Sequence, residues 1–212
     1  MAHPLLRVTA MGRLLPLVLV VVSLAASEAR ADGVYFSESL GGTSIKDELG
    51  ARMSGAFRLR IAGGVRRGSW AVEGWLGGDI ATTERPNDDL VPGALLSYGL
   101  DAKYLQPVMD HVEIYLRGGL SHGEMSGELD GYGGRGLGVG AGVQLKGKVP
   151  AIGFLWWPLF FTGWGPKVTA SVFVDDGFDF YRLHKGGDLR ATPAIDAQLT
   201  HLTVGFAIGS DF

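Results

Sequence analysis

The amino-acid sequence predicts an all-β protein, an eight-stranded antiparallel up-and-down transmembrane β-barrel preceded by a cleaved signal peptide. Three observations lead to this prediction. Eight segments alternate apolar residues with polar or small ones, which is the period of a β-strand. Glycine supplies 34 of the 212 residues, which disfavours helices and suits curved, closely packed strands. A secretory signal precedes the first of these segments.

The N-terminus has the three parts of a signal peptide. Two arginines flank its start, a 13-residue apolar run covers residues 14–26, and Ala29-Arg30-Ala31 places small residues at a cleavage site. The run is shorter than the roughly 20 residues that a spanning helix needs. We therefore expect residues 1–31 to be removed and residues 32–212 to form one barrel domain.

Composition excludes several function classes. Cysteine is absent, so the chain has no disulfides and no thiol chemistry. The net charge is −3 without a basic stripe, and we expect no nucleic-acid partner. The histidines lack metal-ligand spacing, and the glycine-rich stretch 131–140 lies in a predicted strand without the helix of a dinucleotide site. We expect no cofactor and no metal.

Eight strands follow in order, and each has two distinct faces. The predicted strands are 33–42, 51–63, 69–80, 93–105, 112–121, 135–146, 167–175 and 200–212. From the second strand on, the apolar faces include Met53, Phe57, Leu59 and Ile61; Trp70, Val72 and Leu76; Leu96, Leu100 and Tyr104; Val112, Ile114 and Leu116; Leu137, Val139 and Val143; Val168, Val172 and Val174; and Leu202, Val204, Phe206 and Ile208. Polar loops mostly alternate with tight turns between them, as in an up-and-down barrel.

The apolar face is expected to meet lipid and the charged face to line the interior. Several strands are long enough to cross a bilayer when tilted, and a sheet in lipid must close because an open edge leaves unpaired backbone groups. A soluble barrel with an apolar core would show the same period. The signal peptide and the aromatic residues at the turn-side ends of strands, Trp70, Tyr104 and Phe212, favour the membrane alternative.

Charges inside such a barrel have to neutralise one another. A hairpin folded symmetrically about Arg66–Arg67 places Arg60 opposite Glu73. A second hairpin, folded about Val108, places Lys103 opposite Glu113 and Asp101 diagonal to Arg117. The predicted interior charge network is Arg58, Arg60, Glu73, Asp101, Lys103, Glu113 and Arg117.

The segment 152–164 is unusually aromatic for a turn. Its residues include Trp156 and Trp157, which, with Trp70, Tyr104 and Phe212, we predict to be membrane-interface aromatics. A contact site for a periplasmic or membrane partner is the alternative. Two further irregularities interrupt the pattern: Asp176 falls on the apolar face, and residues 194–200 are out of phase, which suggests bulges or positions above the hydrocarbon.

With its signal peptide, strand parity and C-terminal stretch VGFAIGSDF (204–212), the chain resembles the small eight-stranded outer-membrane barrels of Gram-negative bacteria, the OmpA-type or opacity-type group. The resemblance implies location in the outer membrane, contact with its lipid, and recognition by the barrel assembly machinery. Phe206, Ile208 and Phe212 would carry that assembly signal. Ser210 departs from the pattern, since the family usually has an apolar residue there.

The function that follows is a structural or surface-interaction role through the extracellular loops, without catalysis; the sequence does not identify the loop ligand. A narrow pore or small-ligand carrier is the alternative, favoured by the inner glycine stripe Gly136, Gly138, Gly140 and Gly142. A lipid-modifying enzyme is a weaker one. Ser121, His122 and Glu124 have the residue types of a hydrolytic triad, but neighbouring residues on a strand face opposite ways.

Overall fold

The structure is a computed structural model that describes residues 33–51, 53, 55–84, 90–149, 168–186 and 194–210. The predicted signal peptide, the aromatic segment 152–164 with Trp156 and Trp157, and Phe212 lie outside the described residues. Within the described part of the chain, no helix is long and apolar enough to cross a membrane.

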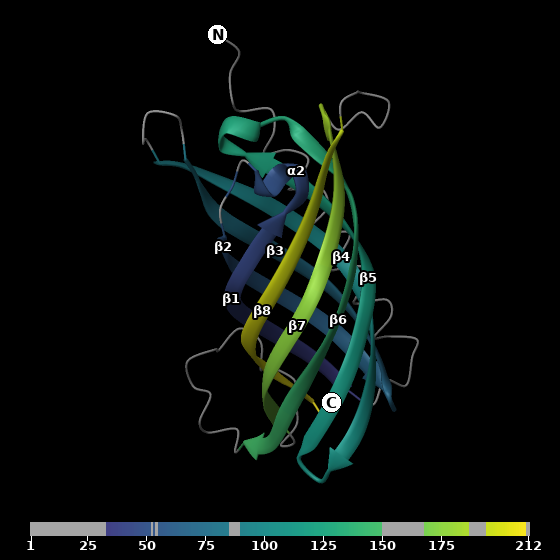
Figure 1. The fold of residues 1–212 in the computed structure, drawn as a ribbon. Coiled ribbons are helices and arrows are strands. Elements are labelled where there is room, and N and C mark those ends of the chain that lie inside the picture. The colour runs from purple at the N-terminus through teal and green to yellow at the C-terminus, as the bar shows by residue number, and fades with distance from the viewer. Residues whose placement is uncertain are drawn as a thin grey trace.

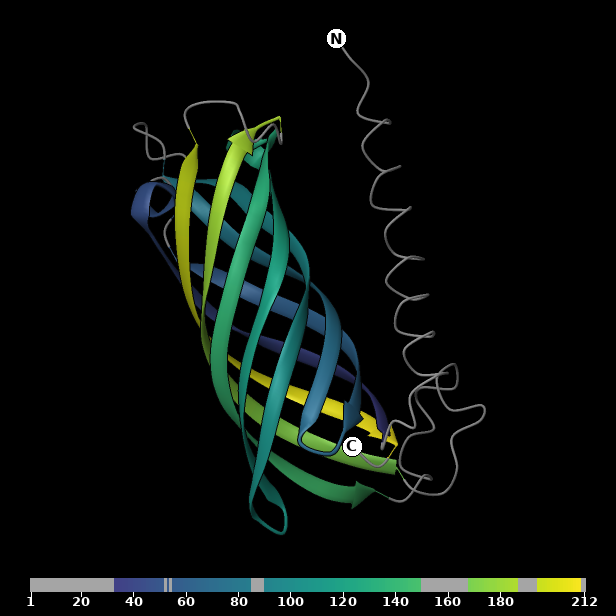
Figure 2. The ribbon, with the colours of Figure 1, turned by 90° about the vertical axis from the view of Figure 1, so that its right-hand side faces the viewer.

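Eight antiparallel strands close into a barrel in the order of the sequence, as predicted (Figure 1). The strands are β1 (Gly33–Lys46), β2 (Ala56–Arg67), β3 (Trp70–Glu84), β4 (Leu90–Met109), β5 (Val112–Ser126), β6 (Tyr132–Val149), β7 (Val168–Lys185) and β8 (Ile195–Ser210). β8 pairs with β1 from Val34↔Ser210 to Lys46↔Gln198, so that no edge strand remains. The strands run obliquely to the barrel axis, as Figure 2 shows.

Two short helices lie at one end of the barrel, α2 (Asp47–Gly50) and the 3-10 turn η2 (Gly127–Leu129). We call this the loop end; the opposite end, where β1 begins and β8 stops, is the turn end (Figure 1). Most strands extend further toward the loop end than the sequence pattern predicted. β4 has 20 residues instead of 13, and β7 has 18 instead of nine.

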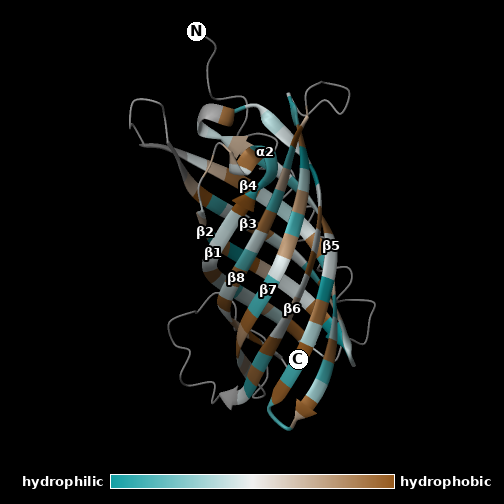
Figure 3. Ribbon diagram, in the orientation of Figure 1, coloured by the Kyte–Doolittle hydropathy of each residue, from teal (hydrophilic) through white to brown (hydrophobic). Residues whose placement is uncertain are grey.

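The apolar face of every strand points outward, as predicted. Large exposed side chains include Leu59 (49% exposed), Leu100 (50%), Leu120 (66%) and Val204 (51%). Hydropathy alternates along the ribbons in Figure 3, because successive side chains of a strand lie on opposite faces of the sheet. Buried positions are largely polar or charged in the middle of the barrel, among them Glu73, Asp101 and Arg117.

The interior has an apolar layer at each end. At the loop end, buried Leu49 of α2 packs with Leu95, Leu183 and Leu199. At the turn end, a smaller aromatic cluster contains Tyr35, Tyr115 and Phe173. Charged side chains fill the space between these two layers.

The loop-end layer corrects two predictions. Met53 precedes β2 and is 2% exposed within this layer, so it does not belong to the outward face. Ile195, Ala197 and Leu199 are buried inside the barrel, and β8 pairs with β7 in continuous register, without a bulge. They share the inward parity of His201 and Thr203, and they are apolar because the interior itself becomes apolar at this height.

Asp176 lies on the outward face, where its parity placed it. It is exposed, it pairs with Ala141 and Leu202, and outward Val174 and Phe178 flank it on β7. Glu38 of β1 is a second exposed outward carboxylate, opposite Ile61 and Phe206. Both acids therefore sit among apolar residues of the outer surface.

Candidate functional site: the charged interior

The structure places every residue of the predicted charge network inside the barrel and adds several more. The predicted members are Arg58, Arg60, Glu73, Asp101, Lys103, Glu113 and Arg117. The further members are Arg66, Asp79, Lys146, Asp175, Asp179 and His201. Alternation along the strands could have identified Asp79 and Asp175, whereas Asp179 lies beyond the predicted end of its strand.

Arg58 connects two acids in the loop-side part of the network. Its Nε donates to Asp79 Oδ1 over 2.8 Å, and its Nη2 lies 2.7 Å from Asp179 Oδ2. Thr43 donates a further hydrogen bond to Asp79 over 2.6 Å. Since the three charged side chains are at most 5% exposed, the guanidinium replaces water as the donor for both carboxylates.

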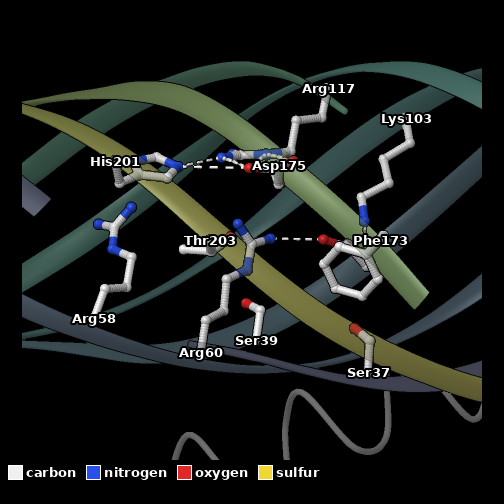
Figure 4. Close-up of a pocket in the computed structure, with 11 residues that line it drawn as sticks. Ser37, Ser39, Arg58, Arg60, Lys103, Arg117, Phe173, Asp175, His201 and Thr203 are labelled. Carbon is white, nitrogen blue, oxygen red and sulfur yellow. Dashed lines mark hydrogen bonds and ion pairs between the residues drawn. The ribbon is translucent and has the colours of Figure 1, made fainter. Parts of the chain in front are cut away.

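Arg117 occupies the middle of the barrel, where Figure 4 shows it converging with Asp175 and His201. The Nη2 atom of Arg117 lies 2.8 Å from Asp175 Oδ1 and 2.6 Å from His201 Nε2, while Nη1 lies 3.3 Å from Asp101 Oδ2. Tyr115 also donates to Asp175, over 2.9 Å. Because a guanidinium has only hydrogen-bond donors, His201 Nε2 accepts the hydrogen bond from Arg117.

Arg60 and Lys103 share Glu73 below this centre. Arg60 Nη2 lies 2.6 Å from Glu73 Oε1 and 2.7 Å from Asp101 Oδ2, and Lys103 Nζ lies 2.7 Å from Glu73 Oε2. The Arg60 guanidinium also covers the ring of Trp75, 4.5 Å from its centroid, and the indole N–H of Trp75 donates to Asp101. Glu73 is thus held by two cations at once.

A separate cluster closes the turn end. The carboxylate of Glu113 accepts two hydrogen bonds from Arg66, of 2.8 and 3.0 Å, and lies 2.9 Å from Lys146 Nζ. Gln144 donates to the same carboxylate over 2.6 Å. Glu113 therefore belongs to a cluster different from the one that contains Lys103.

The predicted registers of both hairpins are wrong. Arg60 stands opposite Gly77 rather than Glu73, because β2 turns at Gly68, with φ +57°, and not at Arg66–Arg67. Glycine adopts this backbone conformation without the steric cost of a side chain. The Arg60–Glu73 ion pair forms nevertheless, because the long side chains meet diagonally across the strands.

In the second hairpin, Lys103 stands opposite Arg117, and its ion-pair partner is Glu73 instead of Glu113. The hairpin turns at Asp110–His111 instead of Val108, and the register shifts by one residue between Pro107 and Met109. Asp101 faces Gly119 and reaches Arg117 from there. Proline has no N–H for the ladder, which is why a bulge is tolerated at this point.

Large side chains cover the inner glycine stripe. A Cβ atom at Gly136 or Gly142 would collide with the rings of Tyr181 and Tyr115, and one at Gly138 would collide with Asp179. The described residues enclose cavities of about 20 Å³ and about 10 Å³ beside the network. A cavity of that size has room for about one water molecule. The glycines make room for side chains rather than for a channel.

Ser121, His122 and Glu124 do not converge on a common point. Ser121 lies on the interior side, where its hydroxyl approaches the position above Gly136, whereas His122 points outward and contacts Glu124 over 3.6 Å. Among the described residues, no three His, Asp or Glu side chains are grouped as metal ligands.

The predicted interface and assembly residues that the structure describes all lie on the outer surface. Trp70 and Tyr104 are direct cross-strand partners near the turn end, are 60% and 39% exposed, and stack edge-to-face with centroids 5.1 Å apart. Phe206 and Ile208 are on the outward face of β8, and Phe206 is 39% exposed.

Comparison with known proteins bears on the fold. No family model and no curated protein matches the chain. Neisserial surface protein A superposes with a TM-score of 0.55 at 18% identity, covering 87% of this chain and 100% of its own. The attachment invasion locus protein Ail of Yersinia pestis, solved with the heparin analogue sucrose octasulfate, gives 0.43 at 14% identity, covering 84% and 97%.

The outer membrane protein OprG of Pseudomonas aeruginosa gives a TM-score of 0.41 at 11% identity, covering 85% of this chain and 96% of its own. The similarity to Neisserial surface protein A spans the whole of that barrel and agrees with the strand number and the closed topology described above. This chain therefore has the fold of the small eight-stranded outer-membrane β-barrels.

Proposed function

We propose that the chain is an integral protein of the Gram-negative outer membrane with a structural or surface-interaction role through its extracellular loops. The observation that carries the proposal is the orientation of the two faces: leucines, valines and phenylalanines cover the outside, while paired ions fill the inside. In water, this orientation would expose a continuous apolar surface and bury charge at a large cost in free energy. In a bilayer, the apolar outer face contacts acyl chains, and the paired ions stay inside the barrel.

Closure of the barrel supports the same location. β8 pairs with β1 from Val34↔Ser210 to Lys46↔Gln198, so the described strands leave no open sheet edge to face hydrocarbon. Trp70 and Tyr104 are suited to the headgroup boundary at the turn end, since each combines an apolar ring with a polar atom. We propose that residues 1–31 direct export and that Phe206, Ile208 and Phe212 present the assembly signal.

The filled interior favours a loop-display role over conduction. The ionic centre leaves cavities with room for about one water molecule, and Leu49, Leu95, Leu183 and Leu199 fill the loop end. An interior packed up to its mouth gives the connecting loops a rigid base. Ser121 and His122 face opposite sides of the wall, which supports a role without hydrolysis.

Three measurements test the proposal together. A membrane barrel resists dodecyl sulfate until it is boiled, so we expect the unboiled band to migrate differently from the boiled one. Cell fractionation should place the chain in the outer membrane, and planar bilayers should show no steady conductance. Partitioning into the aqueous phase would instead indicate a soluble binder, and regular conductance steps would indicate a pore.

A further inference from the structure

Four outward side chains form one row across neighbouring strands near the loop end. Tyr98 of β4 is the register partner of His122 in β5, His122 is that of Arg135 in β6, and Arg135 is that of Arg182 in β7. The rings of Tyr98 and His122 lie 5.4 Å apart. Because adjacent strands are about 4.8 Å apart, the whole row is about 15 Å wide.

On β5, β6 and β7, the row marks the loop-side limit of the apolar outer surface. Two residues nearer the turn end, the same three strands β5, β6 and β7 present Leu120 (66% exposed), Leu137 (58%) and Phe180 (46%). Arg135 is exposed, and the side chain of Arg182 is 71% exposed. The two arginines thus lie on the loop side of apolar side chains that would contact acyl chains.

The two arginines are direct cross-strand partners, an arrangement that like charges make unfavourable. Among the described residues, no carboxylate lies within ion-pair distance of Arg135. Arg182 approaches Asp196 over 3.8 Å, but both side chains are more than 60% exposed, so this ion pair stabilises little. An anion held between the two guanidinium groups would remove the repulsion.

We propose that Arg135 and Arg182 bind the phosphate group of a phosphorylated, acylated lipid of the outer leaflet, of the lipid A type. The Cβ atoms of such cross-strand partners are about 5 Å apart, and each planar guanidinium can donate paired hydrogen bonds to phosphate oxygens. His122 and Tyr98 extend the polar edge, and Leu120, Leu137 and Phe180 contact the acyl chains. This inference rests on the proposed outer-membrane location.

Two carboxylates near the row oppose an anion and therefore give the proposal a sharper test. Asp196 contacts Arg182, and Glu124 lies 3.6 Å from His122. If phosphate binds between the arginines, Asp196 competes with it for Arg182. Replacement of Asp196 by asparagine should then strengthen binding two- to threefold.

The test uses the full-length barrel in zwitterionic detergent, titrated with diphosphorylated lipid A, with the same lipid after removal of its phosphates, and with inorganic phosphate. We expect the phosphorylated lipid to bind at least tenfold more tightly than the dephosphorylated one. Arg135→Gln/Arg182→Gln should abolish this preference, and higher salt should weaken it. Arg67→Gln, at the exposed turn-end rim, is the matched control and should leave it intact.

Other outcomes overturn the inference. Equal affinity for inorganic phosphate would mean that the acyl contacts contribute nothing. An unchanged lipid preference in the double variant would exclude the row as the phosphate-binding site. Heat-modifiable migration of each variant verifies folding, and fractionation tests the location separately, so a correctly located barrel without lipid preference refutes this inference alone.

Discussion

Arg117 and Asp175 provide the most direct test of whether the interior is packed or hydrated. We predict that Arg117→Met will lower the free energy of unfolding by roughly 3–5 kcal/mol, because it leaves Asp175 and Asp101 without their shared cation. At 2.8 Å and an effective dielectric constant of about 20, the direct attraction between Arg117 and Asp175 is ~6 kcal/mol. Part of that attraction offsets the desolvation of the two ions.

The assay is a double-mutant cycle with Arg117→Met, Asp175→Asn and both changes together, using urea unfolding in phospholipid vesicles. The double variant should recover most of the loss, since it leaves neither ion alone, and the coupling energy should be about 2–4 kcal/mol. Arg182→Met removes an ion pair that is exposed, and it should cost at most about 0.5 kcal/mol.

Water in a continuous channel would screen the interior pair as it screens the exposed one. Arg117→Met would then cost less than about 1 kcal/mol, and the coupling energy would approach zero. That result would refute the packed interior and would revive the narrow pore.

Three further predictions use the same unfolding assay. Asp176→Val should stabilise the barrel in bilayers by roughly 1–2 kcal/mol, since it removes a carboxylate from an apolar outer surface; destabilisation would mean that this surface is not in lipid. Gly142→Ala should lower the free energy of unfolding by about 1–3 kcal/mol, because the added methyl group collides with the ring of Tyr115. Gly147→Ala, with open space at its Cβ, should be neutral, and similar effects at both positions would argue against the packed interior. Leu199→Ala should cost roughly 2–4 kcal/mol and outward Leu202→Ala less than about 1 kcal/mol, and a reversed order would contradict the apolar loop-end layer.

Strand number and the direction of each face could be predicted from the sequence because they depend on local alternation. The pattern of Phe57, Leu59 and Ile61 against Arg58 and Arg60 has period two in any barrel, whatever the partners of the strand are. The direction of Asp176 followed from the same rule and holds in the structure. The signal sequence and the aromatic residues at the turn-side strand ends then favoured lipid as the environment of the apolar face.

The ion pairs could be predicted only in part. Arg60 meets Glu73 even though the predicted register is wrong, because long side chains tolerate a diagonal offset. Lys103 and Glu113 have different partners, since the hairpin turns at Asp110–His111 and not at Val108. Arg58 joins Asp179 of β7, which no rule about neighbouring strands could indicate.

The sequence by itself therefore determined an eight-stranded barrel with an apolar outer face and a charged inner face, because side-chain alternation is a property of each strand alone. Only the tertiary structure decided where the turns lie, which ions meet across the interior, and that the interior around Ile195 and Leu199 is apolar. The physical reason is closure: joining β8 to β1 fixes every register at once and brings distant strands together around a space that their side chains have to fill.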